Sequence, residues 1–271
     1  MKKMLSSLLT AALAAVLLCL PVRAETRSVP VYIGGRTVEG ILIEDTTFVP
    51  FDTFCYEMGA DTVTWDPETD VVSAFCRGIV IESKEWASYV EANGRCFYTG
   101  PSCRSIGGML YAPVRALAAA FDAEVIWNAE NFSVELLDGG GVCESGDTYY
   151  WDGAVMWLSR ILYAEAGAEP LAGKIAVGNV ILNRVESPAF PDTIYSVIFD
   201  REYGVQFTPV ANGSIYNDAD EECIRAAKMV LEGVSVSDDA LYFMNAATAD
   251  SRWIEENCEY LFTIGNHSFY Q

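Results

Sequence analysis

The chain has 271 residues, of which 38 are acidic and 17 are basic, so its formal net charge at pH 7 is −21. Nucleic-acid binding depends on clustered Lys and Arg side chains that neutralise phosphates, and this charge balance excludes it. The same balance disfavours adhesion to anionic membranes or anionic polymers by charge alone. A chain of this length suits one or two domains.

Residues 1–24 have the pattern of a secretory signal peptide. Lys2 and Lys3 form its basic start, an apolar run extends from Leu5 to Leu20, and Val22-Arg23-Ala24 offers a cleavage site. The apolar run is short for a transmembrane span, although an uncleaved anchor remains the alternative. No later stretch is long and apolar enough to span a bilayer. We therefore expect a secreted protein with no membrane segment after cleavage.

Eight cysteines occur in the chain, and all but Cys19 lie beyond the signal peptide. In a secreted protein these seven thiols have the potential to form up to three disulfide bridges. Cys96 and Cys103 are close enough for a small loop, and Cys223 with Cys258 would close a larger one. Neither pairing follows from the sequence, and a reducing habitat would leave every thiol free.

Residues 29–136 contain an internal duplication. One copy reads FVPFDTFCYEMGADTVTWDPETDVVSA from Phe48, and the other reads YAPVRALAAAFDAEVIWNAENFSVEL from Tyr111. Each unit has a proline at a helix start, an amphipathic helix, and a strand that ends in tryptophan before a turn. Because Trp65 and Trp127 recur at the same place in the two units, we expect both in the core, with exposed platforms for sugar rings as the alternative.

Further strands are predicted around the duplication. Val29 to Ile43 has the pattern of a hairpin that turns through Gly34-Gly35. Apolar segments over Ile79–Ile81 and Cys96–Tyr98 add two more strands. The half of the chain from 25 to 138 is therefore expected to be a small α+β domain.

This half resembles the domain named for the amino terminus of copper amine oxidases. The shared features are the V-P or A-P helix start, the G-A or D-A helix end, and W-D or W-N before the last strand. The half contains no histidine, so the resemblance implies neither copper binding nor oxidase chemistry. It implies a role in wall attachment or substrate positioning, and a spacer without a ligand is the alternative. Residues 139–153, rich in Gly with Asp and Ser, are expected to form a flexible linker.

Residues 154–271 contain the central candidate residue, Glu165. Apolar residues at helical spacing predict a helix that ends at Glu165-Ala166-Gly167, and Pro170 suits the first turn of a second helix. Burial at such a corner, next to Leu162 and Tyr163, would raise the pKa of the Glu165 carboxyl. Glu165 would then remain protonated near neutral pH and serve as a general acid.

Four segments of this half resemble the catalytic domain of SleB-type spore-cortex-lytic cell wall hydrolases. They read AEAGAEPLAGKIAVGNVILNRVESPAFPDTIYSVIF (164–199), QFTPVANG (206–213), ALYFMNAATADSRWI (240–254) and IGNHSFY (264–270). The resemblance implies a mostly helical, lysozyme-like fold for residues 154–271, with Glu165 as the catalytic acid. It implies peptidoglycan glycan strands as the substrate and the cell wall or spore cortex as the place of action.

The resemblance also implies a mechanism with one carboxylate. Ordinary glycoside hydrolysis uses two carboxyl groups, and Glu169 is expected to point toward solvent. A lytic transglycosylase uses a single glutamate, which protonates the glycosidic oxygen and then accepts the proton of the substrate's own C6 hydroxyl. The resulting cleavage between N-acetylmuramic acid and N-acetylglucosamine leaves a 1,6-anhydromuramic end. Glu165 would perform both proton transfers.

Several residues in the matching segments are candidates for substrate contact. They are Gln206, Tyr242, Asn245 and His267. For His267, a structural hydrogen-bonding role is the alternative. Helix caps are predicted at Asp192, and at Asp218 or Asp220.

Other function classes are weaker. His267 is the single histidine, so the several His or Cys ligands of a zinc site are missing, and we expect no metal and no cofactor. A Cys–His peptidase would need an activated Cys223, but the adjacent acidic residues would raise the pKa of its thiol. A muramidase that uses water, with a carboxylate from residues 200–220, and a non-catalytic wall-binding protein remain alternatives. The oligomeric state and the choice between cortex and vegetative wall stay open.

Overall fold

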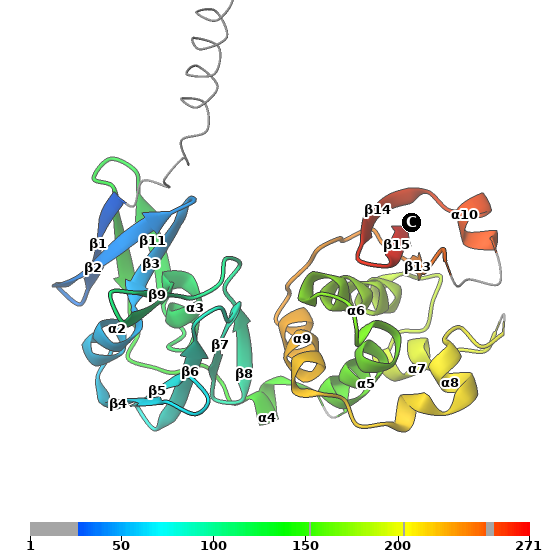
Figure 1. Ribbon diagram of the computed structural model, residues 1–271, viewed down its shortest axis with the longest axis horizontal. Helices are drawn as coiled ribbons and strands as arrows, with labels where there is room; N and C mark the ends of the chain where they lie inside the picture. Colours follow the sequence, from blue (N-terminus) through cyan, green and yellow to red (C-terminus); the bar gives the residue numbers. More distant parts are fainter. Residues whose placement is uncertain (1–26, 152, 203, 248–251) are drawn as a thin grey trace, which may run out of the picture.

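The computed structural model describes residues 27–151, 153–202, 204–247 and 252–271. A sheet-rich N-terminal domain and a helical C-terminal domain lie beside each other along the longest axis, with the short helix α4 (Gly146–Tyr149) between them (Figure 1). The predicted α+β class is confirmed. The predicted signal peptide, residues 1–24, lies outside the described residues.

Two repeat units build the N-terminal domain, as the duplication predicted. The first comprises β3 (Thr46–Pro50), α2 (Phe51–Glu57), β4 (Ala60–Asp66) and β5 (Val71–Cys76). The second comprises β10 (Met109–Pro113), α3 (Val114–Ala119), β11 (Glu124–Asn128) and β12 (Ser133–Leu137). A proline precedes each helix, where its fixed φ fits and its missing N–H leaves no donor unsatisfied. Because β3 and β10 pair antiparallel, with Val49 opposite Ala112, the two units are related by an approximate twofold axis.

The strands of this domain form two sheets. The larger has the order β11-β12-β1-β2-β3-β10-β9, and the smaller has the order β4-β5-β6-β7-β8. The remaining strands are β1 (Arg27–Ile33), β2 (Arg36–Ile43), β6 (Ile79–Lys84), β7 (Tyr89–Ala92), β8 (Arg95–Tyr98) and β9 (Arg104–Ile106). Gly34 and Gly35 join β1 to β2 with φ angles of 55° and 85°, which glycine adopts without strain. The predicted hairpin and both further strands are confirmed.

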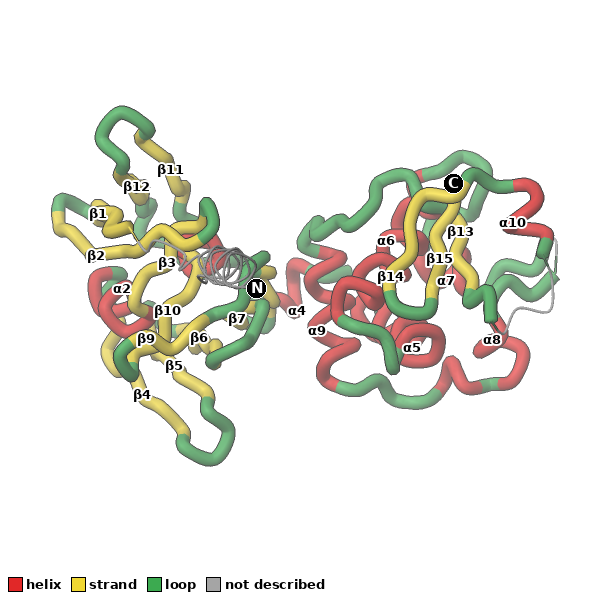
Figure 2. The backbone as a smooth tube through the Cα atoms, turned by 45° about the horizontal axis from the view of Figure 1, so that its top comes forward, coloured by secondary structure: helices red, strands yellow, loops and turns green. Residues whose placement is uncertain are grey.

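The two recurring tryptophans are not core residues. Trp65 is 60% exposed and Trp127 is 38% exposed. Each indole shares a strand face with a half-buried valine two positions earlier, but the hairpin tips extend past the core (Figure 2). The expectation that both indoles are buried is therefore wrong, because strand alternation identifies a face and not the depth to which that face is covered.

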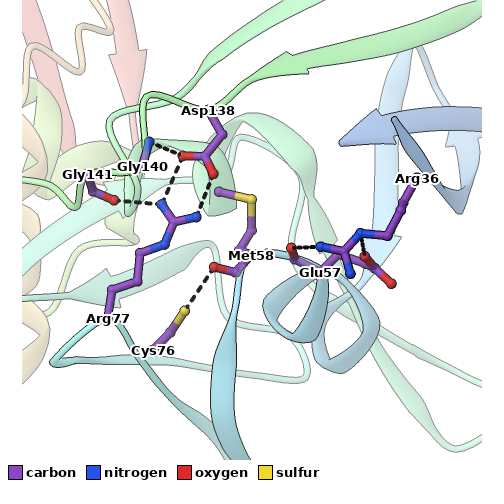
Figure 3. Close-up of polar contacts among 8 residues, drawn as sticks. All are labelled: Arg36, Glu57, Met58, Cys76, Arg77, Asp138, Gly140 and Gly141. Atoms are coloured by element: carbon purple, nitrogen blue, oxygen red, sulfur yellow. Dashed lines mark hydrogen bonds and ion pairs between the residues drawn. The ribbon is translucent and has the colours of Figure 1, made fainter. Parts of the chain in front are cut away.

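The segment between the domains is held by specific contacts. Arg77, in the turn between β5 and β6, donates from Nη1 to the Asp138 carboxylate at 2.8 Å and to the Gly141 carbonyl at 2.9 Å (Figure 3). Further on, Asn93 Nδ2 donates to the Cys143 carbonyl at 2.8 Å. The glycine-rich stretch thus packs along the N-terminal domain, which differs from the flexible linker that its composition suggested.

The two domains share a buried polar interface. Glu232, just after α9 (Glu221–Leu231), accepts hydrogen bonds from Arg95 Nε at 2.8 Å and from the Tyr150 hydroxyl at 2.7 Å. The side chains of Arg95 and Glu232 are only 13% and 8% exposed. Cys96, next to Arg95 in β8, is buried within the hydrophobic core of the C-terminal domain. The hairpin of β7 and β8 therefore pairs with the N-terminal sheet and contributes side chains to the cores of both domains.

The C-terminal domain is mainly helical. Its helices are α5 (Ala154–Ala166), α6 (Leu171–Glu186), α7 (Ile194–Ile198), α8 (Thr208–Asn212), the 3-10 helix η1 (Ser214–Tyr216), α9 and α10 (Trp253–Asn257). Helices α5, α6 and α9 pack against one another. Gly178 permits the contact between α6 and α9, because a Cβ there would lie 2.8 Å from a methyl carbon of Val230. Among the described residues no helix combines the length and apolarity needed to cross a bilayer.

A small sheet completes the C-terminal domain. It has the order β13-β15-β14, with β13 (Tyr242–Met244), β14 (Tyr260–Ile264) and β15 (His267–Tyr270). Of the two predicted caps Asp218 and Asp220, the structure has Asp220, whose side chain accepts from the Cys223 N–H at the start of α9. Thr193 rather than the predicted Asp192 caps α7.

All seven cysteines in the described residues are free thiols. Cys96 lies in the C-terminal core and Cys103 in the N-terminal core, so the small loop between them does not form. Cys223 is likewise unbridged to Cys258. Burial raises the pKa of the Cys223 thiol to about 12, with Asp220 adding to the effect, which removes the basis for a Cys–His peptidase.

We predict that Arg95→Ala uncouples the two domains. Glu232 would remain buried without its cation, which should cost about 3 kcal/mol of unfolding free energy. Calorimetry should then show two thermal transitions where the wild type shows one. The matched control is Arg36→Ala, since Arg36 is 66% exposed in its ion pair with Glu57 (Figure 3) and should contribute less than about 1 kcal/mol. A single transition at the wild-type temperature in Arg95→Ala would contradict the coupling.

Candidate active site

Glu165 lies in the last turn of α5, at the corner between two helices. The corner closes tightly, because a Cβ at Gly167 would lie 2.6 Å from the Tyr163 carbonyl oxygen. Pro170 then caps α6. The predicted arrangement of a carboxylate between two largely buried helices is confirmed.

Burial raises the pKa of Glu165 from its ordinary value of 4.5 to about 7. Burial is the sole cause, because no charged or hydrogen-bonding group of the described chain compensates the carboxylate. The predicted upward shift is confirmed. A carboxyl group with this pKa is protonated in a large fraction of molecules at neutral pH and can donate that proton, which suits a general acid.

Glu169 has the opposite environment. It is buried, and its carboxylate accepts from the Asn266 backbone N–H at 2.9 Å and from Asn266 Nδ2 at 2.8 Å. Burial acts to raise the pKa of Glu169, but these hydrogen bonds outweigh it and hold the pKa below its usual range. The expectation that Glu169 points toward solvent is therefore wrong, because its partner comes from the distant turn between β14 and β15.

Lys174 ties the same corner to the rest of the domain. It is only 2% exposed, and its ammonium donates to the Glu169 carbonyl at 2.6 Å and to the Glu222 carboxylate at 3.3 Å. The first contact spans the start of α6 and the second reaches α9. The turn between α5 and α6, which follows Glu165, is thus held by a buried cation.

Of the four candidate contact residues, three are half-buried and the fourth, His267, is buried. Gln206 is half-buried, and its Nε2 donates to the Gly204 carbonyl at 3.2 Å, while the next residue, Phe207, stacks on Phe243. Tyr242 is half-buried and packs edge-on against Phe190. Asn245, at the end of β13, accepts from the Ala247 N–H at 3.0 Å. The structure therefore gathers three of the family segments around one aromatic cluster.

His267 differs from the other candidates because it is buried. It is 6% exposed and packs edge-on against Phe243 at 5.3 Å, and its Nδ1 has no hydrogen-bond partner among the described residues. Burial lowers the pKa of His267, so the ring is neutral at pH 7. The expectation of direct substrate contact is not supported by this burial, and the ring instead fills space behind the aromatic cluster.

Arg184 is a buried cation that the sequence did not single out. Its Nε donates to the Leu241 carbonyl at 2.7 Å, and its guanidinium lies 5.3 Å from the Tyr242 ring centroid and 5.4 Å from that of Phe207. Burial lowers the pKa of Arg184 to about 10, so it keeps its charge at neutral pH. It thereby brings a positive charge to the rings of Tyr242 and Phe207, and Asp200 acts on that charge electrostatically. In the sequence it was indistinguishable from an exposed arginine near a helix end.

A second aromatic group lies along α5. The Trp157 ring meets Tyr195 at 5.3 Å and Phe199 at 5.2 Å, and Tyr216 lies 6.2 Å away. Tyr195 is 52% exposed and Tyr216 is 61% exposed. These two rings offer flat apolar surface on the same domain as Glu165, of the kind on which sugar rings stack.

Two families match parts of this chain. Residues 168–270 match the Cell Wall Hydrolase family, a range that begins just after Glu165, and residues 32–136 match the Copper amine oxidase N-terminal domain. Both resemblances drawn from the sequence are confirmed.

Individual relatives match the C-terminal half. The spore cortex-lytic enzyme of Halalkalibacterium halodurans is 41% identical over 120 residues, which are 44% of this chain and 35% of that protein. The enzyme of the same name from Bacillus subtilis is 39% identical over 112 residues, 41% of this chain and 35% of that protein. The match thus spans about a third of the length of these relatives. The catalytic domain of the germination-specific lytic transglycosylase SleB from Bacillus anthracis is 36% identical, with 45% of this chain and 97% of that domain covered and a TM-score of 0.42.

We predict that Glu165→Gln stabilises the protein at alkaline pH. The folded-state pKa of about 7 exceeds the ordinary 4.5, so the wild type loses stability as pH rises from about 5 to 7, while the amide does not titrate. The variant should exceed the wild type by about 2 to 3 kcal/mol at pH 8 and by little at pH 5. Urea unfolding at both pH values measures this difference. A difference that does not change with pH would contradict a raised pKa for the Glu165 carboxyl.

Proposed function

Because the C-terminal domain of this chain belongs to the cell wall hydrolase family, we propose that the protein degrades peptidoglycan. It cleaves the glycosidic bond between N-acetylmuramic acid and N-acetylglucosamine, as a lytic transglycosylase with Glu165 as its single catalytic carboxyl. The observation that carries this proposal is the half-buried Glu165 side chain, whose pKa is raised to about 7 with loss of solvation as its sole cause. The SleB catalytic domain, named a lytic transglycosylase, supports the reaction type.

The cleavage reaction consumes no water molecule. Protonated Glu165 donates its proton to the glycosidic oxygen, and the bond between that oxygen and C1 of the muramic residue breaks. The resulting Glu165 carboxylate then accepts the proton of the C6 hydroxyl of the same residue, whose oxygen bonds to C1. One carboxyl group thus serves as acid and then as base, and it returns to its protonated form.

Other residues position the glycan. Because the chain is strongly acidic, binding depends on stacking and hydrogen bonds rather than on bulk charge. We assign stacking to the exposed rings of Tyr195 and Tyr216, and hydrogen bonding to Gln206, Tyr242 and Asn245. Arg184, which is only 5% exposed, would hold these groups in place from beneath without touching the substrate. His267 supports the cluster from behind.

A muramidase that uses water is the alternative enzyme. Its second carboxylate would have to come from the 200–220 region. Asp220 already caps α9, and Asp218 pairs with Arg160 at 2.9 Å with its side chain 96% exposed. Asp200 is half-buried and acts electrostatically on Arg184, which makes it the strongest candidate for that role. A non-catalytic wall-binding protein is the remaining alternative.

Secretion is part of the proposal. The predicted signal peptide and the place of action of the relatives, which are named for the spore cortex, agree with export to the wall or cortex. Glycan strands of peptidoglycan are the proposed partner on either target.

We predict that the wild type releases anhydromuropeptides from purified peptidoglycan, and that Glu165→Gln lowers the rate by at least about 10³-fold, because the amide cannot donate the proton. Mass spectrometry of the released material measures both effects. Asp200→Asn is the matched control and should keep at least about a third of the activity.

Reducing-end products, lost together with activity in Asp200→Asn, would replace the transglycosylase with the muramidase. Absence of products from both cortex and vegetative wall would favour the non-catalytic alternative.

We predict that kcat/KM falls as pH rises through about 7, since the reactive form of Glu165 is the protonated one. Above that pH the rate should drop about tenfold per unit, and below it the rate should level off. Initial rates of product release from pH 5 to 9 give this profile, with circular dichroism at each pH as the control for folding. A rate that increases through pH 7 would contradict an acid role for Glu165.

A further inference from the structure

The N-terminal domain contains two clefts related by its internal duplication. Each cleft lies against the helix start and hairpin of one repeat unit, and volumes of about 430 and 510 Å³ fit a small ligand. The first cleft is lined by residues that include Asp52, Val63, Trp65, Asp70, Val72 and Glu85. The second is lined by residues that include Thr46, Thr47, Arg115, Val125, Trp127 and Val134.

The two clefts share one apolar pattern. The first presents Trp65 between Val63 and Val72, and the second presents Trp127 between Val125 and Val134, at the same positions of the repeat. Both indoles are exposed, although each lies on the same strand face as a half-buried valine, Val63 or Val125. An exposed indole at one place in both units gives each cleft a flat ring with hydrogen-bonding groups around it.

We propose that both clefts bind the glycan strand of peptidoglycan, with one sugar ring stacked on each indole. This site assignment rests on the proposed function, because it takes the enzyme's substrate as the ligand. Trp65 is held in place by the bond from its Nε1 to Asp70 Oδ1 at 2.9 Å, and Trp127 is held by edge-on contact with Phe132 at 5.3 Å. Fixed rings reduce the entropy lost on binding.

The polar groups differ between the clefts in a way that suits two kinds of sugar. In the first cleft Asp52, Asp70 and Glu85 supply carboxylate oxygens that accept hydrogen bonds from the hydroxyls of an uncharged sugar. In the second cleft Arg115 occupies the position equivalent to Asp52, Asp45 also lines the cleft, and the guanidinium suits acyl oxygens. N-acetylglucosamine fits the first cleft, and N-acetylmuramic acid, whose lactyl group adds an acyl oxygen, fits the second.

A folded protein is a poorer occupant. Centres of protein interfaces are depleted in Asp and Glu, whereas the first cleft contains three carboxylates. An anionic polymer is excluded by the net charge of −21. The hairpins that carry the indoles lie at opposite ends of the domain in both views (Figures 1 and 2). One strand that reaches both clefts would therefore be held at two points, which raises the apparent affinity.

The test uses the full mature chain with Glu165→Gln, so that the polymer is not cleaved. Cosedimentation with purified, insoluble peptidoglycan gives the apparent Kd of this parent and of its Trp65→Ala, Trp127→Ala and double variants. Each single change should weaken binding about fivefold and the double change at least about tenfold. Trp86→Ala is the matched control, because Trp86 is 73% exposed in the same domain and lines neither cleft.

Equal binding by the parent and the double variant, or an equal loss in Trp86→Ala, would overturn the proposal. The double variant should unfold at the same temperature as its parent. When the two tryptophan changes are made in the active protein, which retains Glu165, activity on soluble glycan fragments should also be unchanged.

The two proposals fail in different ways. If the wild type releases no product but binding depends on Trp65 and Trp127, the activity is wrong and the clefts stand. If products are released and binding is independent of both indoles, the clefts are wrong and the activity stands.

Discussion

A buried polar network at the corner of α5 and α6 determines where the candidate acid lies. Lys174 joins the Glu169 carbonyl to Glu222 on α9, and the Glu169 carboxylate holds Asn266 in the C-terminal hairpin. Such buried groups are costly when unpaired, so the corner, α9 and the hairpin must assemble together. Glu165 itself needs no polar partner. The hydrogen bonds that hold the corner together are made by Glu169, four residues further on. The Glu165 carboxyl can therefore stay without a polar partner.

The repeat domain was predictable because its determinants are local. Proline at each helix start, glycine in the first hairpin and two-residue alternation in the strands all act over a few residues. The errors came from contacts that are distant in sequence. Composition suggested a flexible linker, but Arg77 holds Asp138 from 61 residues away. Alternation placed Trp65 and Trp127 on the correct face, but it carries no information on where the core ends.

In the candidate site, Glu165 followed from helix periodicity and from the family resemblance, and its raised pKa followed from burial. The role of Glu169 was not predictable, since Asn266 lies 97 residues further along the chain. Arg184 carried no signal either, because its aromatic surroundings come from separate segments. The resemblance selected His267 by its place in a matching block, and only the packing of β15 shows that the ring is buried.

The hairpin of β7 and β8 belongs to one domain by strand pairing, and its side chains pack into the cores of both domains. Cys96 fills part of the C-terminal core, so a gene fragment that encodes only residues 139–271 would leave an apolar hollow open to water. The C-terminal half is thus not a free module that can be moved between proteins unchanged. If the repeat domain were exchanged during evolution, the surface of α9 that packs against it would have to change as well. The two halves are therefore expected to evolve together.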